Sequence, residues 1–195
     1  MPDFGPQIHL DNPAFIHPSV LLYGKVSVAP GASLWPHVVA RSECAEVRIG
    51  RFSNVQDFVM LHTVPEFGAI IGDYCSITHH CTIHCCTIGD NCLIGINSTI
   101  MDGCVIGDNC IIGGNSFLKP GTIIPDNSVV VGSPGKVIKT VNNFIANRMN
   151  AVIYHYMAQA YARGEHRPCT GEAFERFVSE QQQKLTAEFA RLYGE

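Results

Sequence analysis

Branched apolar residues recur along the first two thirds of the chain at intervals of six positions. Two intervals are one residue short, and a longer excursion, His62 to Ile70, separates Leu61 from Ile71. Neither the period of two of a β-strand nor the period of 3.6 of an α-helix explains this spacing. The recurring positions are Val20, Val26, Ala32, Val38, Cys44, Ile49, Val55, Leu61, Ile71, Ile77, Ile83, Ile88, Ile94, Ile100, Ile106, Ile112, Leu118, Ile124 and Val130.

A three-sided coil explains the interval of six, because each unit then forms one short strand and one corner. A second, small residue follows each recurring position by four places, as at Cys75, Cys92, Ser98 and Cys110, and we expect it to point into the narrow interior. Most of the nine cysteines should therefore be small buried side chains and not a disulfide framework. About six coils stacked about 4.8 Å apart would make a prism roughly 29 Å tall.

Two segments, 88–93 and 106–111, read Ile-Gly-Asp-Asn-Cys followed by a branched residue, and they resemble the hexapeptide repeat of left-handed parallel β-helix proteins. The closing segment 132–138 is similar to the exit segment common in that group. The resemblance implies a mainly β fold, with a left-handed parallel β-helix of about six coils over residues 10–138. It also implies a homotrimer.

Helical spacing replaces the six-residue interval after Lys139. The apolar positions predict one helix over 143–163 and a second over about 171–193, ending at Gly194. We expect this segment, 139–195, to pack along a face of the prism. A partner-binding role for the last helix is the alternative.

Composition narrows the function classes. Of the 195 residues 46% are hydrophobic and 15% are charged, and the net charge is −4. This balance, with no basic run, argues against a nucleic-acid partner or an anionic membrane surface. No apolar stretch approaches the roughly 20 residues that span a bilayer, and Met1–Pro6 carries no secretory signal. We therefore expect a soluble, cytoplasmic protein that binds neither nucleic acid nor membrane.

Three of the nine histidines fall at related positions of the repeat. His62 follows Leu61 and His84 follows Ile83, three units later, so the two should stack in adjacent coils about 5 Å apart. That separation suits two nitrogens on one metal ion. His79 lies on the preceding face, where only a neighbouring subunit could bring it to the same ion. Three unrelated histidines on a polar edge are the alternative.

A second resemblance rests on motifs that flank these histidines. The motifs Arg41-Ser42-Glu43, Gln56-Asp57, Leu61-His62, Thr78-His79 and His84-Cys85-Cys86 occur in the order and spacing of γ-class carbonic anhydrases. Relatives of that family include phenylacetate-pathway and carnitine-operon proteins. The similarity covers roughly residues 10–138.

The resemblance implies a role for each motif residue. His62 and His84 of one subunit and His79 of the next would bind zinc, with iron or cobalt as alternatives. With the fourth position open, the ion could bind a water and lower the pKa of that water to near 7. Gln56 would orient that water. Arg41 and Asp57 would form an ion pair near the trimer interface, with Glu43 beside them. His80 is expected on the solvent side. A structural interface role stays open for Arg41, Glu43 and Asp57.

Three departures from the family pattern bear on activity. The family usually has Arg-Gly-Asp, Gly-His and His-Gly-Cys where this chain has Arg41-Ser42-Glu43, Thr78-His79 and His84-Cys85-Cys86. The prototype also carries an acidic loop that shuttles protons, whereas the excursion from His62 to Ile70 holds only Glu66. This difference argues against rapid CO2 hydration.

Three functions from different classes follow. The first is a zinc-dependent lyase of the carbonic anhydrase kind, acting on CO2 and bicarbonate. The second is an acyl-CoA transferase or thioesterase of the same fold, in which a histidine acts as general base. The third is a non-catalytic trimeric scaffold that keeps the metal for stability. An open fourth metal position would favour an enzyme, and a protein side chain in that position would favour the scaffold.

Overall fold

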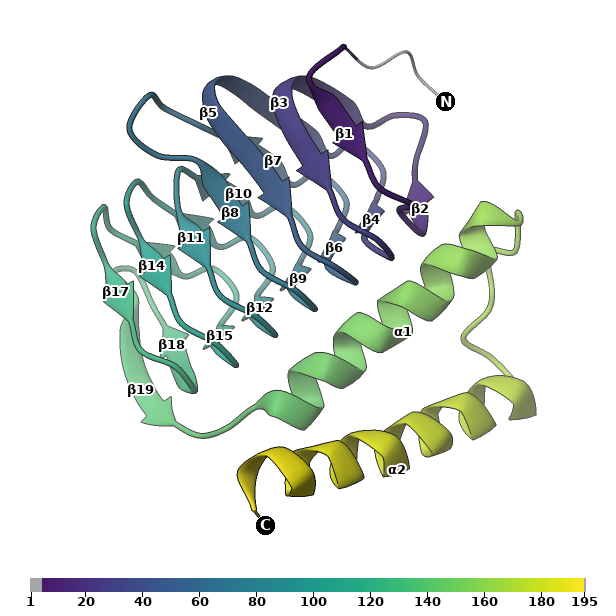
Figure 1. The fold of residues 1–195 in the computed structure, drawn as a ribbon. Coiled ribbons are helices and arrows are strands. Elements are labelled where there is room, and N and C mark those ends of the chain that lie inside the picture. The colour runs from purple at the N-terminus through teal and green to yellow at the C-terminus, as the bar shows by residue number, and fades with distance from the viewer. Residues whose placement is uncertain (1–4, 195) are drawn as a thin grey trace.

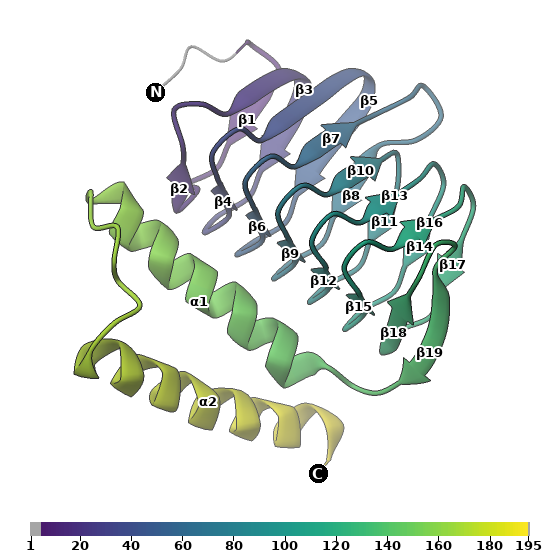
Figure 2. The ribbon, with the colours of Figure 1, turned by 180° about the vertical axis from the view of Figure 1, so that it is seen from behind.

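Residues 5–194 of the computed structural model form a left-handed parallel β-helix followed by two α-helices (Figure 1). Residues 1–4, for which the sequence predicts no secretory signal, and residue 195 lie outside the described residues. The coils stack in chain order, so the first and last strands lie at opposite ends of the prism (Figures 1 and 2).

Three stacks of parallel strands form the faces of the prism. The first comprises β2 (Phe15–Ile16), β4 (Ser33–Leu34), β6 (Asn54–Val55), β9 (Ser76–Ile77), β12 (Leu93–Ile94), β15 (Ile111–Ile112) and β18 (Ser128–Val131), with β19 (Lys136–Thr140) antiparallel to β18. The second, here called the histidine face, comprises β7 (Met60–His62), β10 (Thr82–His84), β13 (Thr99–Ile100) and β16 (Phe117–Leu118). The third comprises β1 (Ile8–Leu10), β8 (Ala69–Ile71), β11 (Thr87–Ile88), β14 (Val105–Ile106) and β17 (Ile123–Ile124).

Two long strands, β3 (Leu21–Val28) and β5 (Val39–Ile49), cross the corner between the second and third faces. Because β1 and β2 precede Val20, the β-helix has about seven coils, one more than the spacing predicts. The predicted phase of the six-residue interval is also wrong before Ile49. Cys44, one of the predicted interior positions, is exposed in the irregular middle of β5.

The interior follows a two-residue pattern in each coil. A large side chain such as Ile77, Ile94 or Ile112 lies two positions after a small one such as Cys75, Cys92 or Cys110, and all are buried. Before Ile49 the large positions are Leu22, Val28, Leu34 and Ala40, each two residues after the predicted one. All nine cysteines are free and seven are buried, which confirms that most serve as small interior side chains.

The two helices have nearly the predicted bounds, α1 at Phe144–Ala162 and α2 at Glu172–Tyr193. Helix α1 runs along the first face, and α2 runs along the outer side of α1 (Figures 1 and 2). Polar contacts fix α1: Asn147 Nδ2 donates to the carbonyls of Asn91 and Cys110, and the Arg148 guanidinium lies 3.7 Å from the centroid of the Tyr74 ring. Helix α1 thus covers the first face, whereas no helix within residues 5–194 lies on the histidine face.

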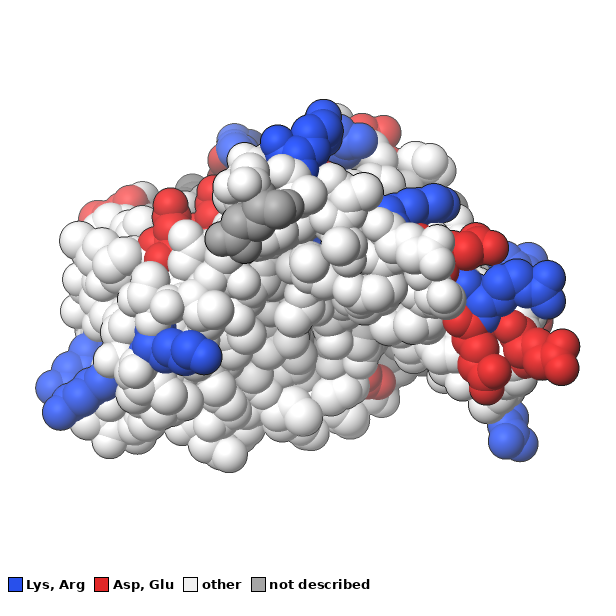
Figure 3. Space-filling model, turned by 90° about the horizontal axis from the view of Figure 1, so that it is seen from below, with Lys and Arg blue, Asp and Glu red and all other residues white. Residues whose placement is uncertain are grey.

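Charged side chains gather at the margins of the surface seen from below, and the middle of that surface is largely uncharged (Figure 3). On this side acidic and basic groups alternate, and no continuous basic surface is present. Neither helix is apolar enough over its length to cross a bilayer.

Candidate metal site

His62 and His84 project from the histidine face in adjacent coils. Strands β7 and β10 pair with Leu61 opposite Ile83 and His62 opposite His84. Because Leu61 and Ile83 are completely buried, the alternation of a strand directs both imidazoles outwards. Their ring centroids lie 5.0 Å apart, as the spacing of the repeat predicts.

The two imidazoles approach closely enough to hold one ion. His62 Nδ1 lies 2.9 Å from His84 Nε2. Two nitrogens bound tetrahedrally to zinc at 2.0–2.1 Å would be about 3.3 Å apart, so a small separation of the rings admits the metal. The side chains of His62 and His84 are 23% and 25% exposed, which leaves the pair open to solvent on one side.

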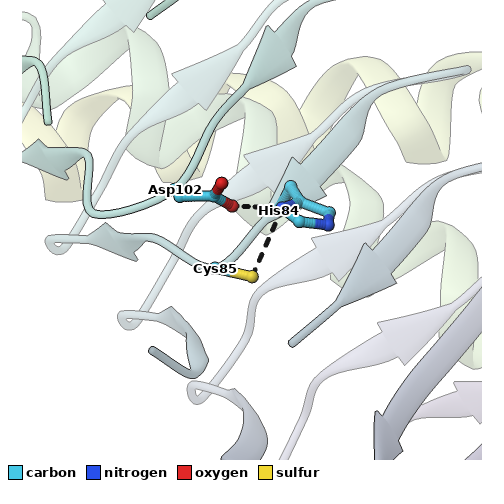
Figure 4. Close-up of side chains that lie close together, drawn as sticks. All are labelled: His84, Cys85 and Asp102. Atoms are coloured by element: carbon cyan, nitrogen blue, oxygen red, sulfur yellow. Dashed lines mark hydrogen bonds and ion pairs between the residues drawn. The ribbon is translucent and has the colours of Figure 1, made fainter. Parts of the chain in front are cut away.

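Asp102 fixes the orientation of His84. It follows β13 in the next coil, and its Oδ1 contacts His84 Nδ1 (Figure 4). A carboxylate at Nδ1 holds the ring proton there and leaves the Nε2 lone pair directed at His62. The sequence motifs that flank the three histidines do not include Asp102. Its position 18 residues after His84, one coil further on, is the signal that identifies it.

Cys85 lies on the same side of His84 as Asp102, with Sγ 3.3 Å from His84 Nδ1 (Figure 4). Burial, reinforced by the hydrogen bond and negative charge of Asp102, raises the pKa of the Cys85 thiol to about 12. The thiol is therefore protonated at neutral pH and is a poor nucleophile. Both Cys85 and Asp102 meet the same ring nitrogen, so the three residues do not form a nucleophile–base–carboxylate relay.

His79 occupies a different corner of the prism, after β9. Its Nδ1 lies 3.0 Å from Oδ2 of Asp57, which leaves Nε2 free for a ligand. Among residues 5–194, one group of three His, Cys, Asp or Glu side chains has possible ligand atoms that all lie within 4.8 Å of one another. It consists of His84, Cys85 and Asp102. Within one chain His79 therefore does not reach His62 and His84. This agrees with the expectation that only a neighbouring subunit could bring His79 to the same ion.

Arg41 and Glu43 lie beside His62. Arg41 pairs in register with His62 across β5 and β7, and its Nη1 donates to Glu43 Oε1 at 2.6 Å. Glu43 Oε2 lies 3.4 Å from His62 Nε2. The expected Arg41–Asp57 ion pair is not formed within the described chain, because Glu43 is closer along β5 and Asp57 contacts His79 instead.

Gln56 is buried directly after β6 and lies off the histidine face. Its Nε2 donates to Asn54 Oδ1 at 2.9 Å, and Asn54 Nδ2 in turn donates to Ser76 Oγ. Because Gln56 precedes Asp57, it belongs to the same corner as His79. Tyr154 of α1 is also close to this corner: burial, with a smaller effect from the Asp57 charge, raises its pKa to about 12. His80, next to His79, is exposed as expected and stacks on Phe58.

Comparison with known protein families matches residues 85–120 to the bacterial transferase hexapeptide family, described as six repeats. A probable carbonic anhydrase of Methanocaldococcus jannaschii is 41% identical over 80 residues, which are 41% of this chain and 50% of that protein. The mitochondrial gamma carbonic anhydrase 1 of Arabidopsis thaliana is 27% identical over 95% of this chain and 70% of its own length. The carnitine operon protein CaiE of Salmonella agona is 34% identical over 71% of this chain and 69% of its own length.

Two solved structures share the fold over most of the chain. A hexapeptide transferase family protein from Anaplasma phagocytophilum has a TM-score of 0.75 and 27% identity, and the match covers 79% of this chain and 92% of that one. A protein described as a putative acetyltransferase from Bacillus cereus has a TM-score of 0.70 and 30% identity, over 76% and 91% of the two chains.

Proposed function

Because the chain belongs to the γ-carbonic-anhydrase-like family of hexapeptide-repeat proteins, we propose that it is a metal-dependent enzyme that hydrates CO2 reversibly to bicarbonate. The site would consist of His62 and His84 of one subunit and His79 of a neighbour in a homotrimer. The 2.9 Å approach of His62 to His84, with Asp102 behind His84, is the observation that carries this proposal.

The donor set fits zinc, with iron or cobalt as alternatives, since all three prefer imidazole nitrogen. When bound with one position open, such an ion acts as a Lewis acid that brings the pKa of a water near 7. The chain would supply three unprotonated imidazole nitrogens as ligands. Asp102 and Asp57 do this for His84 and His79 by holding a proton on Nδ1 of each ring.

Each hydration of CO2 releases one proton, which must reach solvent before the next turnover. Glu43 is suited to carry it, because the carboxylate is half-exposed and its Oε2 lies 3.4 Å from His62 Nε2. Arg41, which binds the other oxygen of Glu43, holds the carboxylate in place. Gln56 lies at the same corner as His79 and would orient a water at the shared site, with its side chain held by the hydrogen bond from its Nε2 to Asn54 Oδ1.

Replacing Asp57 by asparagine should weaken zinc binding about 10–100-fold, the usual effect of losing a carboxylate behind a metal-bound histidine. The asparagine amide no longer enforces the Nδ1–H tautomer of His79. Competition with a fluorescent zinc chelator measures the change. The exposed carboxylate of Glu165, which pairs with Arg163 far along the chain, supplies a matched control: Glu165→Gln should leave zinc affinity unchanged. Equal affinity for Asp57→Asn and the parent would contradict the assignment.

Stopped-flow CO2 hydration by the zinc-loaded, full-length chain tests the activity. We expect saturable hydration that is abolished in His62→Ala and retained in His80→Ala, because His80 is exposed at a corner and stacks on Phe58. Hydration at the buffer rate by fully metal-loaded protein would reject the proposal.

Acyl-CoA transfer or thioester hydrolysis is the second candidate, and the structural similarity to the Bacillus cereus protein described as a putative acetyltransferase favours it. A neutral Cys85 thiol rules that residue out as the nucleophile, so a histidine would have to act as general base on water or an amine. Release of free CoA thiol from acetyl-CoA by the same preparation, with no CO2 hydration, would support this second function.

A further inference from the structure

A second set of metal-ligating atoms lies within one chain, on the far side of His84 from His62. It consists of His84 Nδ1, Cys85 Sγ and an Asp102 carboxylate oxygen, which all lie within 4.8 Å of one another (Figure 4). The sulfur is 3.3 Å from the nitrogen. Zinc at about 2.3 Å from sulfur and about 2.0 Å from nitrogen fits between atoms at this spacing.

The backbone holds these donors in place. The Cys85 amide donates to the His62 carbonyl at 3.0 Å, and the Gly103 amide donates to the Cys85 carbonyl at 2.8 Å. The corner is therefore tied to the coil on each side. Cys85 has a φ of +57°, a backbone conformation that favours glycine. A cysteine at this position therefore carries a conformational cost that glycine would not.

Charge also favours a divalent cation at this corner. Binding would replace the S–H bond of Cys85 by a metal–sulfur bond and release the proton to solvent. The thiolate and the Asp102 carboxylate then carry two negative charges, which balance a 2+ ion beside a completely buried sulfur. A mixed nitrogen, sulfur and oxygen set suits Zn²⁺ or Co²⁺ and disfavours Mg²⁺ and Ca²⁺.

The two nitrogens of His84 make this site an alternative to the three-histidine site. With the ring proton on Nε2, His84 donates to His62 Nδ1 over the observed 2.9 Å and frees Nδ1 for the metal. With the proton on Nδ1, the ring contacts Asp102 and frees Nε2 instead. We propose that Cys85, Asp102 and His84 Nδ1 form a single-chain site for a divalent transition metal, which requires no neighbouring subunit.

Cobalt titration of the full-length chain in a His79→Ala background tests this site, because His79→Ala removes the shared site and leaves the three donors intact. We expect about one Co²⁺ per chain with a thiolate-to-cobalt charge-transfer band in the near ultraviolet. Adding Cys85→Gly should abolish the band and weaken Co²⁺ binding at least about 100-fold. Glycine suits the local backbone, so this variant should fold.

Cys86→Ala in the same background is the matched control, since Cys86 is the adjacent thiol and is buried towards the core. It should keep both the band and the affinity. A His79→Ala chain that shows no thiolate band, or a band that survives Cys85→Gly, would overturn the single-chain site. The shared site is tested separately by CO2 hydration, because that activity is assigned to His62, His79 and His84 and does not use Cys85.

Discussion

His84→Ala should eliminate metal-dependent activity, as His62→Ala should, and should also remove the single-chain site, which His62→Ala leaves intact. His84 contributes Nε2 to the shared site and Nδ1 to the single-chain site, so its loss removes a ligand from both. Because losing an outer-shell partner already costs about 10–100-fold in metal affinity, loss of a ligand should cost at least about 100-fold. Metal analysis of the purified, zinc-supplied variant and stopped-flow hydration measure the two effects.

His80→Ala is the control for this variant. Its exposed ring stacks on Phe58 at 5.0 Å and makes no contact with His62 or His84 among the described residues. We expect it to retain zinc and activity within about twofold of the parent. Equal zinc content in His84→Ala and His80→Ala would contradict the role of His84 in either site.

Ile94→Ala should be the most damaging change for stability. Ile94 is completely buried in a central coil, where its side chain packs between those of Ile77 and Ile112 in the coils before and after it. Removing it leaves a cavity that the rigid stack cannot close, with an expected cost of about 2–5 kcal/mol. Urea denaturation of metal-free protein, followed by circular dichroism, measures the change.

Ile123→Ala is the matched control, since the same residue type in β17, away from the corner that carries His79, is 74% exposed. Its loss should change the free energy of unfolding by less than about 0.5 kcal/mol. Similar midpoints for the two variants would show that the interior around Ile94 is not packed as described.

The sequence predicts the repeating part of the fold well because each coil repeats the same packing problem. A large residue such as Ile94 and a small one such as Cys92 fill the same two interior positions in successive coils, and this regularity is visible as a period of six. The phase error before Ile49 has a physical cause. Strand β5 is continuous from Val39 to Ile49, and its middle is irregular, with Cys44 exposed. The large interior positions before β5 ends therefore lie two residues after those that the six-residue interval predicts.

The site is only partly predictable from the chain. Stacking of His62 on His84 follows from the strand register, which the repeat fixes. The partners of Glu43 and Asp57 do not follow from it, because side-chain rotamers at exposed corners depend on local contacts. Asp102 and Cys85 are visible as sequence positions, but their convergence on one nitrogen of His84 emerges only from the three-dimensional corner.

Subunit mixing tests the central claim, a metal site shared between subunits, most directly. His62→Ala and His79→Ala chains are each expected to lack CO2 hydration, because every interface of either homotrimer misses one ligand. Unfolding the two together and refolding them at equal amounts should restore about a quarter of the unmodified activity, since one interface in four pairs an intact His62 with an intact His79. Mixed trimers that form, as shown by native mass spectrometry, yet recover no activity would contradict the shared site.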